Sequence, residues 1–565
     1  MKMQRVKIAM GLASFAVFYG AAMGQVDNLT IVLPEVATVG GVPSPSPLAA
    51  FGYDPVNDRM FVAGFSNGDQ ELRRVDNPTA SSVAFQTQVF ATSWLRFNRD
   101  NDLNLGGGSP TPSAMLLNPL PINLPGGGTL PAYSMAAITD AGAIVQSGSG
   151  ATAVRFPEKS NKVYTYNLQQ SVGPIATDVF TQRVTIADLQ AATGAAVTET
   201  SNNIGRQPAW SGDGQSIYFI DTAVPFGGVW KLGAVTGAPV RLLATNTDLN
   251  TEPAVIASGG VDSIFFRGGG ATGNVGGIDK ITHDGTTTSA RTVHVPASEI
   301  ASFFEQPTSD MTSFSMASDG GGNLYFNNTA TARRGIFRLD PEGRVVKVLG
   351  YEERRANFAP EASPSVNSNT LRMQIRSTTY TGNAGSFAVP QLMYTEASGV
   401  NHVAGAYLFR IGDFNRDDVV DQADIGLFKS ALTLSSATPL SGIIAADQPK
   451  LRFDLNGNNV VSWKDVKILQ QFYVFPDGDA DMDKSVNLDD FTALAANFGL
   501  PGRLWTQGDF TGDELVDLND FTTLAANFGA TSPAGAARGS VPEPTAGALI
   551  GALCFMLRLR NRQFA

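Results

Sequence analysis

The chain has 565 residues, of which 59 are glycine and 31 are proline, and a formal net charge of −11. Because no basic patch stands out in this acidic chain, the composition argues against nucleic acid as a partner. Cys554 is the only cysteine, which excludes an internal disulfide framework and leaves the core and bound ions to supply stability.

The first 24 residues have the pattern of a secretory signal peptide. Lys2, Arg5 and Lys7 form a basic start, and an apolar run over 8–22 follows. Small residues, Ala22 and Gly24, suit cleavage by signal peptidase at this point. The apolar run is short for a membrane-spanning helix. We therefore expect residues 1–24 to be removed during export.

Residues 26–411 predict a mainly β region. Turn-forming residues are frequent there, and short apolar triplets recur at 60–62, 217–219, 264–266 and 324–326. Second strands are expected at 229–232, 278–281 and 336–339, and a third at 345–349. The spacing of these units is that of four-stranded blades, so we predict a β-propeller of six or seven blades. Residues 85–130, rich in glycine and proline, fit this pattern poorly, and we expect a long inserted loop there.

One blade has a recognisable signature. Residues 207–214 read QPAWSGDG and lead into a strand at 216–221. This segment resembles the repeat of TolB-like propellers, which are similar to WD40 propellers, with Gly212 where that family usually has proline. We expect the propeller to present a face that binds glycan or protein.

Four acidic segments of 12 residues follow, and each places oxygen-bearing side chains at positions 1, 3, 5, 9 and 12. With a backbone carbonyl at position 7, this is the spacing of an EF-hand calcium loop, since Ca²⁺ takes six to eight oxygen ligands. The predicted ligands are, loop by loop, Asp413, Asn415, Asp417, Val419, Asp421 and Asp424; Asp454, Asn456, Asn458, Val460, Ser462 and Asp465; Asp479, Asp481, Asp483, Ser485, Asn487 and Asp490; and Asp509, Thr511, Asp513, Leu515, Asp517 and Asp520.

The four loops are not expected to be equal. The second has two carboxylates among its side-chain ligands, so we expect the weakest calcium affinity there. Position 6, which usually needs a left-handed backbone, holds Asp418, Asn459, Lys484 and Glu514 rather than glycine. Apolar spacing predicts helices after the third and fourth loops, ending at Gly499 and Gly529.

A calcium loop followed by one helix, with Asp at position 12 and occurring in pairs, resembles the type I dockerin. Residues 412–475 would form the first pair and 476–530 the second. The resemblance implies folding on calcium and docking onto a cohesin-like domain, with Leu488, Asp489, Leu518 and Asn519 influencing the choice of partner. Solvated Asp/Asn-rich turns, or structural calcium sites without a partner, are the alternatives.

Residues 531–540 are predicted to be a linker. The end of the chain has the pattern of a second targeting signal. Val541, Pro542, Glu543 and Pro544 precede an apolar stretch over 545–557 and three arginines. This order resembles the PEP-CTERM sorting signal over 541–565. It implies a short C-terminal helix, transient membrane insertion and processing by an exosortase.

No sequence motif for catalysis appears, so we expect no catalytic residues and no further cofactor. The favoured reading is an exported bacterial surface or matrix protein that binds Ca²⁺. The alternative is a dockerin-tethered carbohydrate-active enzyme, for which Glu252, Asp262, Asp279 and Asp310 are candidate acids. A cluster of carboxylates with an aromatic platform in the propeller channel would distinguish them.

Overall fold

The computed structural model describes most of residues 208–532 and shorter segments before them. The described residues are 29–33, 50–56, 58–66, 69–76, 88–89, 112–130, 135–139, 163–166, 180–182, 184, 186–195, 208–221, 225–244, 252–305, 315–319, 321–328, 334–358, 373–382, 384–397 and 401–532.

Within these residues the strands form six four-stranded antiparallel sheets and one two-stranded hairpin. Five sheets follow the chain: β2 (Ala50–Asp54), β3 (Arg59–Ser66), β4 (Asp69–Asp76) and β5 (Gln88–Val89); β6 (Pro112–Leu117), β9 (Met135–Thr139), β10 (Val163–Tyr166) and β11 (Phe180–Gln182); β12 (Ala209–Trp210), β13 (Ser216–Asp221), β14 (Gly228–Gly233) and β15 (Val240–Ala244); β16 (Ala254–Ser258), β17 (Val261–Arg267), β18 (Ile278–His283) and β19 (Thr292–Val295); and β20 (Met316–Ser318), β21 (Leu324–Asn328), β22 (Gly335–Leu339) and β23 (Val345–Gly350).

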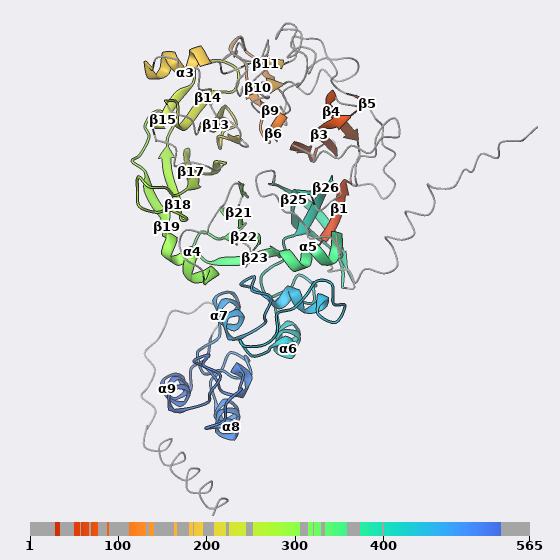
Figure 1. Ribbon diagram of the computed structural model, residues 1–565, viewed down its shortest axis with the longest axis vertical. Helices are drawn as coiled ribbons and strands as arrows, with labels where there is room; N and C mark the ends of the chain where they lie inside the picture. The colour runs from red at the N-terminus through yellow and green to blue at the C-terminus, as the bar shows by residue number, and fades with distance from the viewer. Residues whose placement is uncertain are drawn as a thin grey trace, which may run out of the picture.

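The sixth sheet joins the two ends of the β region. It consists of β24 (Met373–Gly382), β25 (Gly385–Ala397) and β26 (Asn401–Tyr407), and the early strand β1 (Leu29–Leu33) pairs antiparallel with β26. The six sheets stand around a ring in chain order (Figure 1). This is the arrangement of a β-propeller with six blades among the described residues, and β1 closes the ring.

The apolar triplets form strands because each blade is buried on both faces. On β13, Phe219 belongs to one apolar cluster and Tyr218 to the next. On β21, Phe326 and Tyr325 divide in the same way between two neighbouring clusters. A strand covered on both faces needs apolar residues at consecutive positions, so a triplet replaces the usual alternation. The predicted strand positions are confirmed in β3, β13, β14, β17, β18, β21, β22 and β23.

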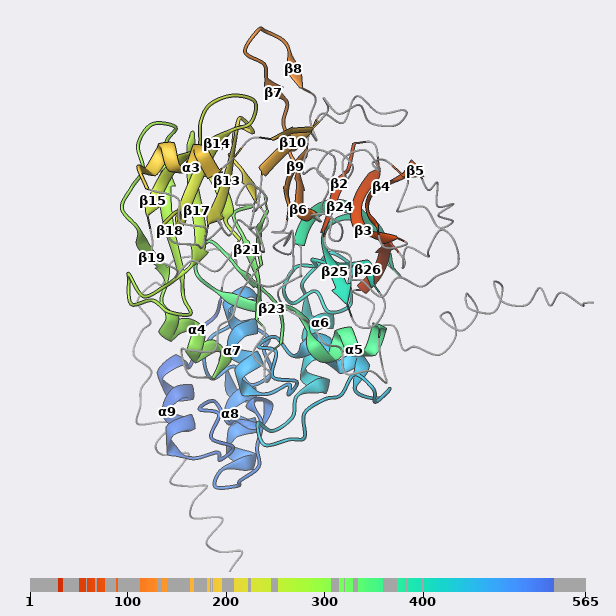
Figure 2. The same cartoon turned by 45° about the horizontal axis from the view of Figure 1, so that its top comes forward.

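The expected long loop at 85–130 is wrong for part of that range. Residues 112–117 form β6, which pairs with β9 and lies at the edge of its sheet among the described strands. Pro112 is tolerated because it is the first residue of an edge strand. Several of the prolines and glycines that made this segment look like a loop lie next to it, in the hairpin of β7 (Ile122–Asn123) and β8 (Thr129–Leu130). This hairpin projects from the ring (Figure 2).

A helical region follows the last blade and packs against the ring on the side of β23 and α5 (Tyr351–Phe358) (Figures 1 and 2). Its helices are α6 (Gln422–Ala431), the 3₁₀ helix η6 (Gln448–Phe453), α7 (Trp463–Phe472), α8 (Leu488–Asn497), the 3₁₀ turn η7 (Trp505–Gln507) and α9 (Leu518–Asn527). One apolar cluster runs through this region and includes Val346 of β23. Two shorter helices, α3 (Ile186–Thr193) and α4 (Ala297–Phe304), lie on the propeller.

Several predicted segments lie outside the described residues. These are the signal peptide at 1–24, most of the linker at 531–540, and the sorting signal with Val541, Pro542, Glu543 and Pro544. Among the helices of the described residues, none has the length and apolar character needed to cross a membrane.

Candidate calcium sites

Each of the four acidic loops ends in a helix. The predicted helices after the third and fourth loops are α8 and α9, and α6 and α7 follow the first two loops in the same way. Each helix has its N-cap at loop position 9: Asp421, Ser462, Asn487 and Asp517. Position 12 therefore lies in the first turn of the helix, where helical backbone fixes its side chain.

The aspartate at position 12 closes the loop through both carboxylate oxygens. In the third loop, Oδ1 of Asp490 accepts from the N–H of Ala480 at 2.6 Å, and Oδ2 accepts from that of Asn487 at 2.8 Å. The equivalent bonds recur at Asp465 and Asp520, and at Asp424 the first donor is the N–H of position 3, Asn415, instead of position 2. One carboxylate thus ties the start of the loop to the N-cap of the helix.

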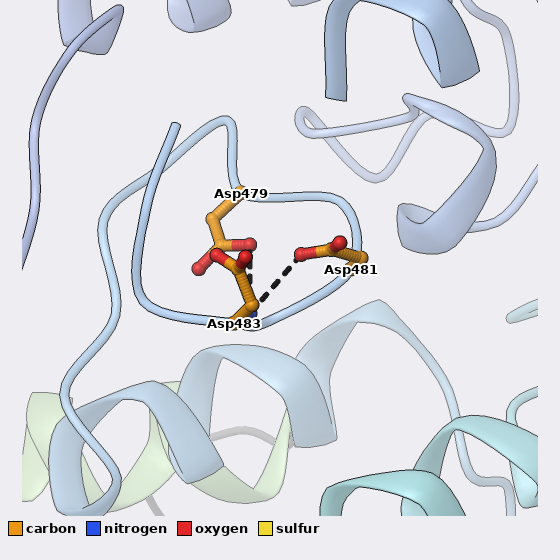
Figure 3. Close-up of side chains that lie close together, drawn as sticks. All are labelled: Asp479, Asp481 and Asp483. Atoms are coloured by element: carbon orange, nitrogen blue, oxygen red, sulfur yellow. Dashed lines mark hydrogen bonds between the residues drawn. The ribbon is translucent and has the colours of Figure 1, made fainter. Parts of the chain in front are cut away.

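The aspartate at position 1 organises the middle of the loop. Asp479 accepts from the N–H of Asp483 at 3.2 Å and from that of Lys484 at 2.8 Å. Asp481 accepts from the same N–H of Asp483, and the three carboxylates converge inside the loop (Figure 3). Position 5 then accepts from position 7, as in the bond from Ser485 to Asp483 at 2.8 Å.

A left-handed backbone occurs at two positions of every loop. Position 6 has φ between 63° and 79° at Asp418, Asn459, Lys484 and Glu514, despite the absence of glycine. Position 4 is also left-handed, at Arg416, Gly457, Met482 and Gly512. Sequence reasoning missed position 4 because its four residues share no chemical type. At position 6, the N–H group donates to the carboxylate of position 1 in every loop, which holds this left-handed backbone in place.

Two loops bring carboxylates close enough to hold a metal ion. Oxygens of Asp479, Asp481 and Asp483 lie within 4.8 Å of one another, and so do those of Asp509, Asp513 and Asp520. Hard oxygen donors at this density suit Ca²⁺. The remaining predicted ligands lie at the predicted positions of each loop. At position 9, the side chains of Asp421, Asn487 and Asp517 accept a hydrogen bond from a backbone N–H at the start of the following helix.

Crowding of these carboxylates disfavours their charged forms when no cation is present. Burial, together with repulsion from Asp490 and Asp481, raises the pKa of Asp479 to about 8. Burial, together with Asp520 and Asp513, raises the pKa of Asp509 to about 6. A bound divalent cation would reverse this penalty, so the shifts mark sites where a cation is electrostatically favoured.

The second loop already contacts a cation from the propeller. The side chain of Lys347 of β23 is 3% exposed, and its Nζ lies 3.4 Å from Oδ2 of Asp454 and 3.2 Å from Oε1 of Glu353. It also donates to the carbonyl of Leu451 at 2.7 Å. Burial alone would lower the pKa of Lys347, but Asp454 and Glu353 outweigh burial and raise it. This ammonium offsets part of the charge that calcium would meet in the loop.

The third and fourth loops brace each other. Gly499, after α8, donates to the carbonyl of Val516 in the fourth loop at 2.7 Å. Gly529, after α9, donates to the carbonyl of Val486 in the third loop at 2.8 Å. The indole N–H of Trp505 adds a hydrogen bond to the third loop, since it donates to the carbonyl of Asp479 at 2.6 Å. The geometry of each loop therefore depends on the helix that follows the other.

The propeller contains a central cavity of about 630 Å³, lined by the first strands of all six blades. Its lining is mostly apolar, and Asp319 is the one carboxylate among the described lining residues. Asp319 accepts bonds from Asn323 and Tyr325, which fix a turn. The described lining thus does not contain the cluster of carboxylates that would distinguish the alternative, a carbohydrate-active enzyme.

The acids weighed as catalytic candidates have structural partners or lie elsewhere. Asp262 accepts from the hydroxyl of Tyr218 at 2.8 Å and from the N–H of Gly212 at 2.9 Å. Asp279 is fully buried and pairs with Arg291 at 2.7 Å. Glu252 is also fully buried. Asp310 lies outside the described residues.

No protein-family model and no curated protein matches the chain. Among solved structures, a Bacteroides thetaiotaomicron protein of unknown function is 12% identical, with a TM-score of 0.36 over 67% of this chain and 76% of that one. A Xanthomonas campestris gluconolactonase is 9% identical, with a TM-score of 0.33 over 67% and 89%. The Dos1 propeller is 9% identical, with a TM-score of 0.30 over 64% and 83%. These likenesses say nothing about function, and the propeller assignment rests on the sheet topology.

Proposed function

We propose that the chain is an exported bacterial surface or matrix protein that binds Ca²⁺ through its C-terminal loops and uses its propeller to bind glycan or protein. The observation that carries the calcium part is the same carboxylate network in four loops, with two aspartate triads dense enough for a cation. The central cavity of about 630 Å³, with its mostly apolar described lining, supports a binding role for the propeller.

The third and fourth loops, which we call the distal pair, are suited to docking a cohesin-like partner. Leu488 and Leu518 occupy the first positions of α8 and α9, and they are 65% and 59% exposed. Exposed leucines at matching positions of two mutually braced helices offer a contact surface. The first pair, by contrast, is packed against the propeller, which leaves it a structural role.

Export and surface retention are tested by fractionating cells of a bacterium that carries an exosortase. The whole chain is expected in the cell envelope or matrix. A chain without residues 541–565 is expected to lose that retention, while one with residues 533–540 replaced by a Gly/Ser linker of equal length should keep it. Equal distribution of all three would refute the sorting role, and retention of the whole chain inside the cell would refute export.

A further inference from the structure

A small cavity lies where the propeller meets the first calcium loop. Its volume is about 90 Å³, and it is lined from β22, β23, α5, β26, η6, the segment that enters the first loop, and the first and second loops themselves. Five of its lining side chains are cationic and two are carboxylates. The cations are Arg338, Lys347, Arg410, Arg416 and Arg452. In a chain with a net charge of −11, such a cluster is a local reversal of sign.

Both carboxylates at this cavity already have partners. Glu353 accepts from the N–H of Gly350 at 2.5 Å and pairs with Lys347. Asp413 accepts from two N–H groups of its own loop, those of Asp417 and Asp418, at 3.1 and 3.0 Å. Two of the five cations are paired as well, Lys347 with Glu353 and Asp454, and Arg410 with Asp418 at 3.1 Å. The cation that a ligand would meet is therefore Arg338.

Of the described residues that line the cavity, Arg338 has the side chain whose hydrogen-bond donors are most clearly without a partner. Its guanidinium lies over the ring of Phe472, 5.6 Å from the centroid, and among the described residues no carboxylate lies within 4 Å of it. Its Nε is buried without a hydrogen-bond acceptor in the described part of the chain. A buried donor without an acceptor is costly, so an incoming oxygen atom would relieve that cost.

Arg344 provides a contrast on the same ring. It stacks on Phe472 at 4.5 Å but does not line the cavity. Its guanidinium pairs with Asp340 at 2.6 Å and Glu342 at 3.1 Å, and it donates to the carbonyl of Gln471. Two arginines with one stacking partner thus differ in whether their donors are already used.

An aromatic surface adjoins the cavity. Tyr407 and Phe409 line it, and both contact Tyr380, at 5.1 and 4.8 Å between ring centroids. These three rings are partly exposed. Aromatic walls with a few convergent polar groups are typical of small-ligand sites, and the arginine fork matches a carboxylate.

We propose that this junction cavity binds the carboxylate of an acidic sugar, with Arg338 as its main anion-binding side chain and Tyr407 and Phe409 as the apolar wall. The proposal rests on the glycan-binding role proposed above. It assigns the recognised group to the junction with the calcium region rather than to the central cavity. Because the cavity is small, it would admit the carboxylate while the sugar ring lies against the aromatic rings.

The test is calorimetric titration of the whole, calcium-saturated chain with a galacturonic acid tetramer, a neutral galactose tetramer and inorganic sulfate. The acidic tetramer is expected to bind more tightly than sulfate, and the neutral tetramer is not expected to bind measurably. Arg338→Met should weaken binding of the acidic tetramer at least tenfold, whereas Arg344→Met should change it less than twofold. Arg338→Lys, which keeps the charge but not the fork, should give an intermediate loss.

Equal binding of the neutral tetramer, binding of sulfate alone, or an unchanged affinity in Arg338→Met would overturn the proposal. Thermal unfolding of each variant checks that it remains folded, and Arg338→Lys decides the matter if Arg338→Met does not fold. Calcium uptake of the same samples separates the two proposals. Normal calcium uptake without sugar binding would refute the junction site alone, and absent calcium uptake would refute the calcium-binding function.

Discussion

At the scale of single residues, the aspartate at position 12 has two tasks. It caps a helix and ties the loop start, and its oxygens also belong to the predicted ligand set. The position of this aspartate could be predicted from the sequence, because helix capping and calcium binding both require a carboxylate at the third residue of the helix that follows the loop. The left-handed turn at position 4 was not readable, since Arg416 and Met482 adopt it without any glycine signature.

Asp490→Ala should lower the free energy of unfolding of the calcium-saturated chain by about 2 kcal/mol, because buried N–H groups lose a charged acceptor. Urea unfolding followed by circular dichroism measures this. Asp489→Ala is the matched control, since Asp489 is exposed one residue earlier in the same helix turn, and it should change stability by less than about 0.5 kcal/mol. Equal losses in the two variants would show that the closing role is misassigned.

Stability of the calcium-free chain should fall as pH rises from about 4 to about 8. The folded pKa values of Asp479 and Asp509, about 8 and about 6, lie above the unfolded value of 3.8. Between these values the folded state binds more protons than the unfolded state, so each rise in pH favours unfolding. Saturating calcium should abolish this slope. Thermal unfolding across the pH range measures it, and a calcium-free chain that gains stability toward pH 8 would contradict the assignment.

At the scale of elements, the four loops are alike in backbone and different in surroundings. The sequence predicted the second as the weakest from its ligand charges, and the structure adds the ammonium of Lys347 from the propeller. That contact could not be predicted because 107 residues separate Lys347 from Asp454. It also makes the second loop part of the joint between the two regions, together with the bond from the N–H of Lys347 to the carbonyl of Leu455 at 2.8 Å.

Lys347→Met should destabilise the chain by about 3 kcal/mol, because it leaves Asp454 and Glu353 buried without their counter-ion. Added calcium should recover part of this loss if it can enter the second loop. Lys450→Met, at an exposed lysine of η6, is the control and should have little effect. Denaturant unfolding with and without calcium measures both variants, and a stable Lys347→Met chain would exclude a role for this ammonium in the joint.

At the scale of the whole molecule, the propeller was predictable from its repeated triplets, but its closure was not. Leu29 lies opposite Ala406, so the two paired strands are far apart in the sequence. No local pattern in residues 29–33 indicates that they pair with β26. The inserted-loop expectation is wrong for residues 112–117 because Pro112 and the flanking glycines were read without the edge position that tolerates them. Repeats thus reveal blades, whereas long-range pairing decides how the ring ends meet.

Removal of residues 1–33 should destabilise the propeller on the order of 3 kcal/mol, because β26 loses a paired strand and the ring opens. Removal of residues 1–27 keeps β1 and serves as the control. Thermal unfolding of the two truncated chains compares them directly. If both unfold at the same temperature, β1 does not close the ring.

Calorimetric calcium titration of the whole chain and of the double variant Asp479→Ala, Asp509→Ala shows whether the acidic loops bind calcium. The wild-type chain is predicted to bind calcium saturably, and the double variant should lose the two sites of the distal pair. Saturable binding should also raise the unfolding temperature of the wild-type chain. A wild-type chain without saturable calcium binding, or a double variant with unchanged stoichiometry, would contradict the account.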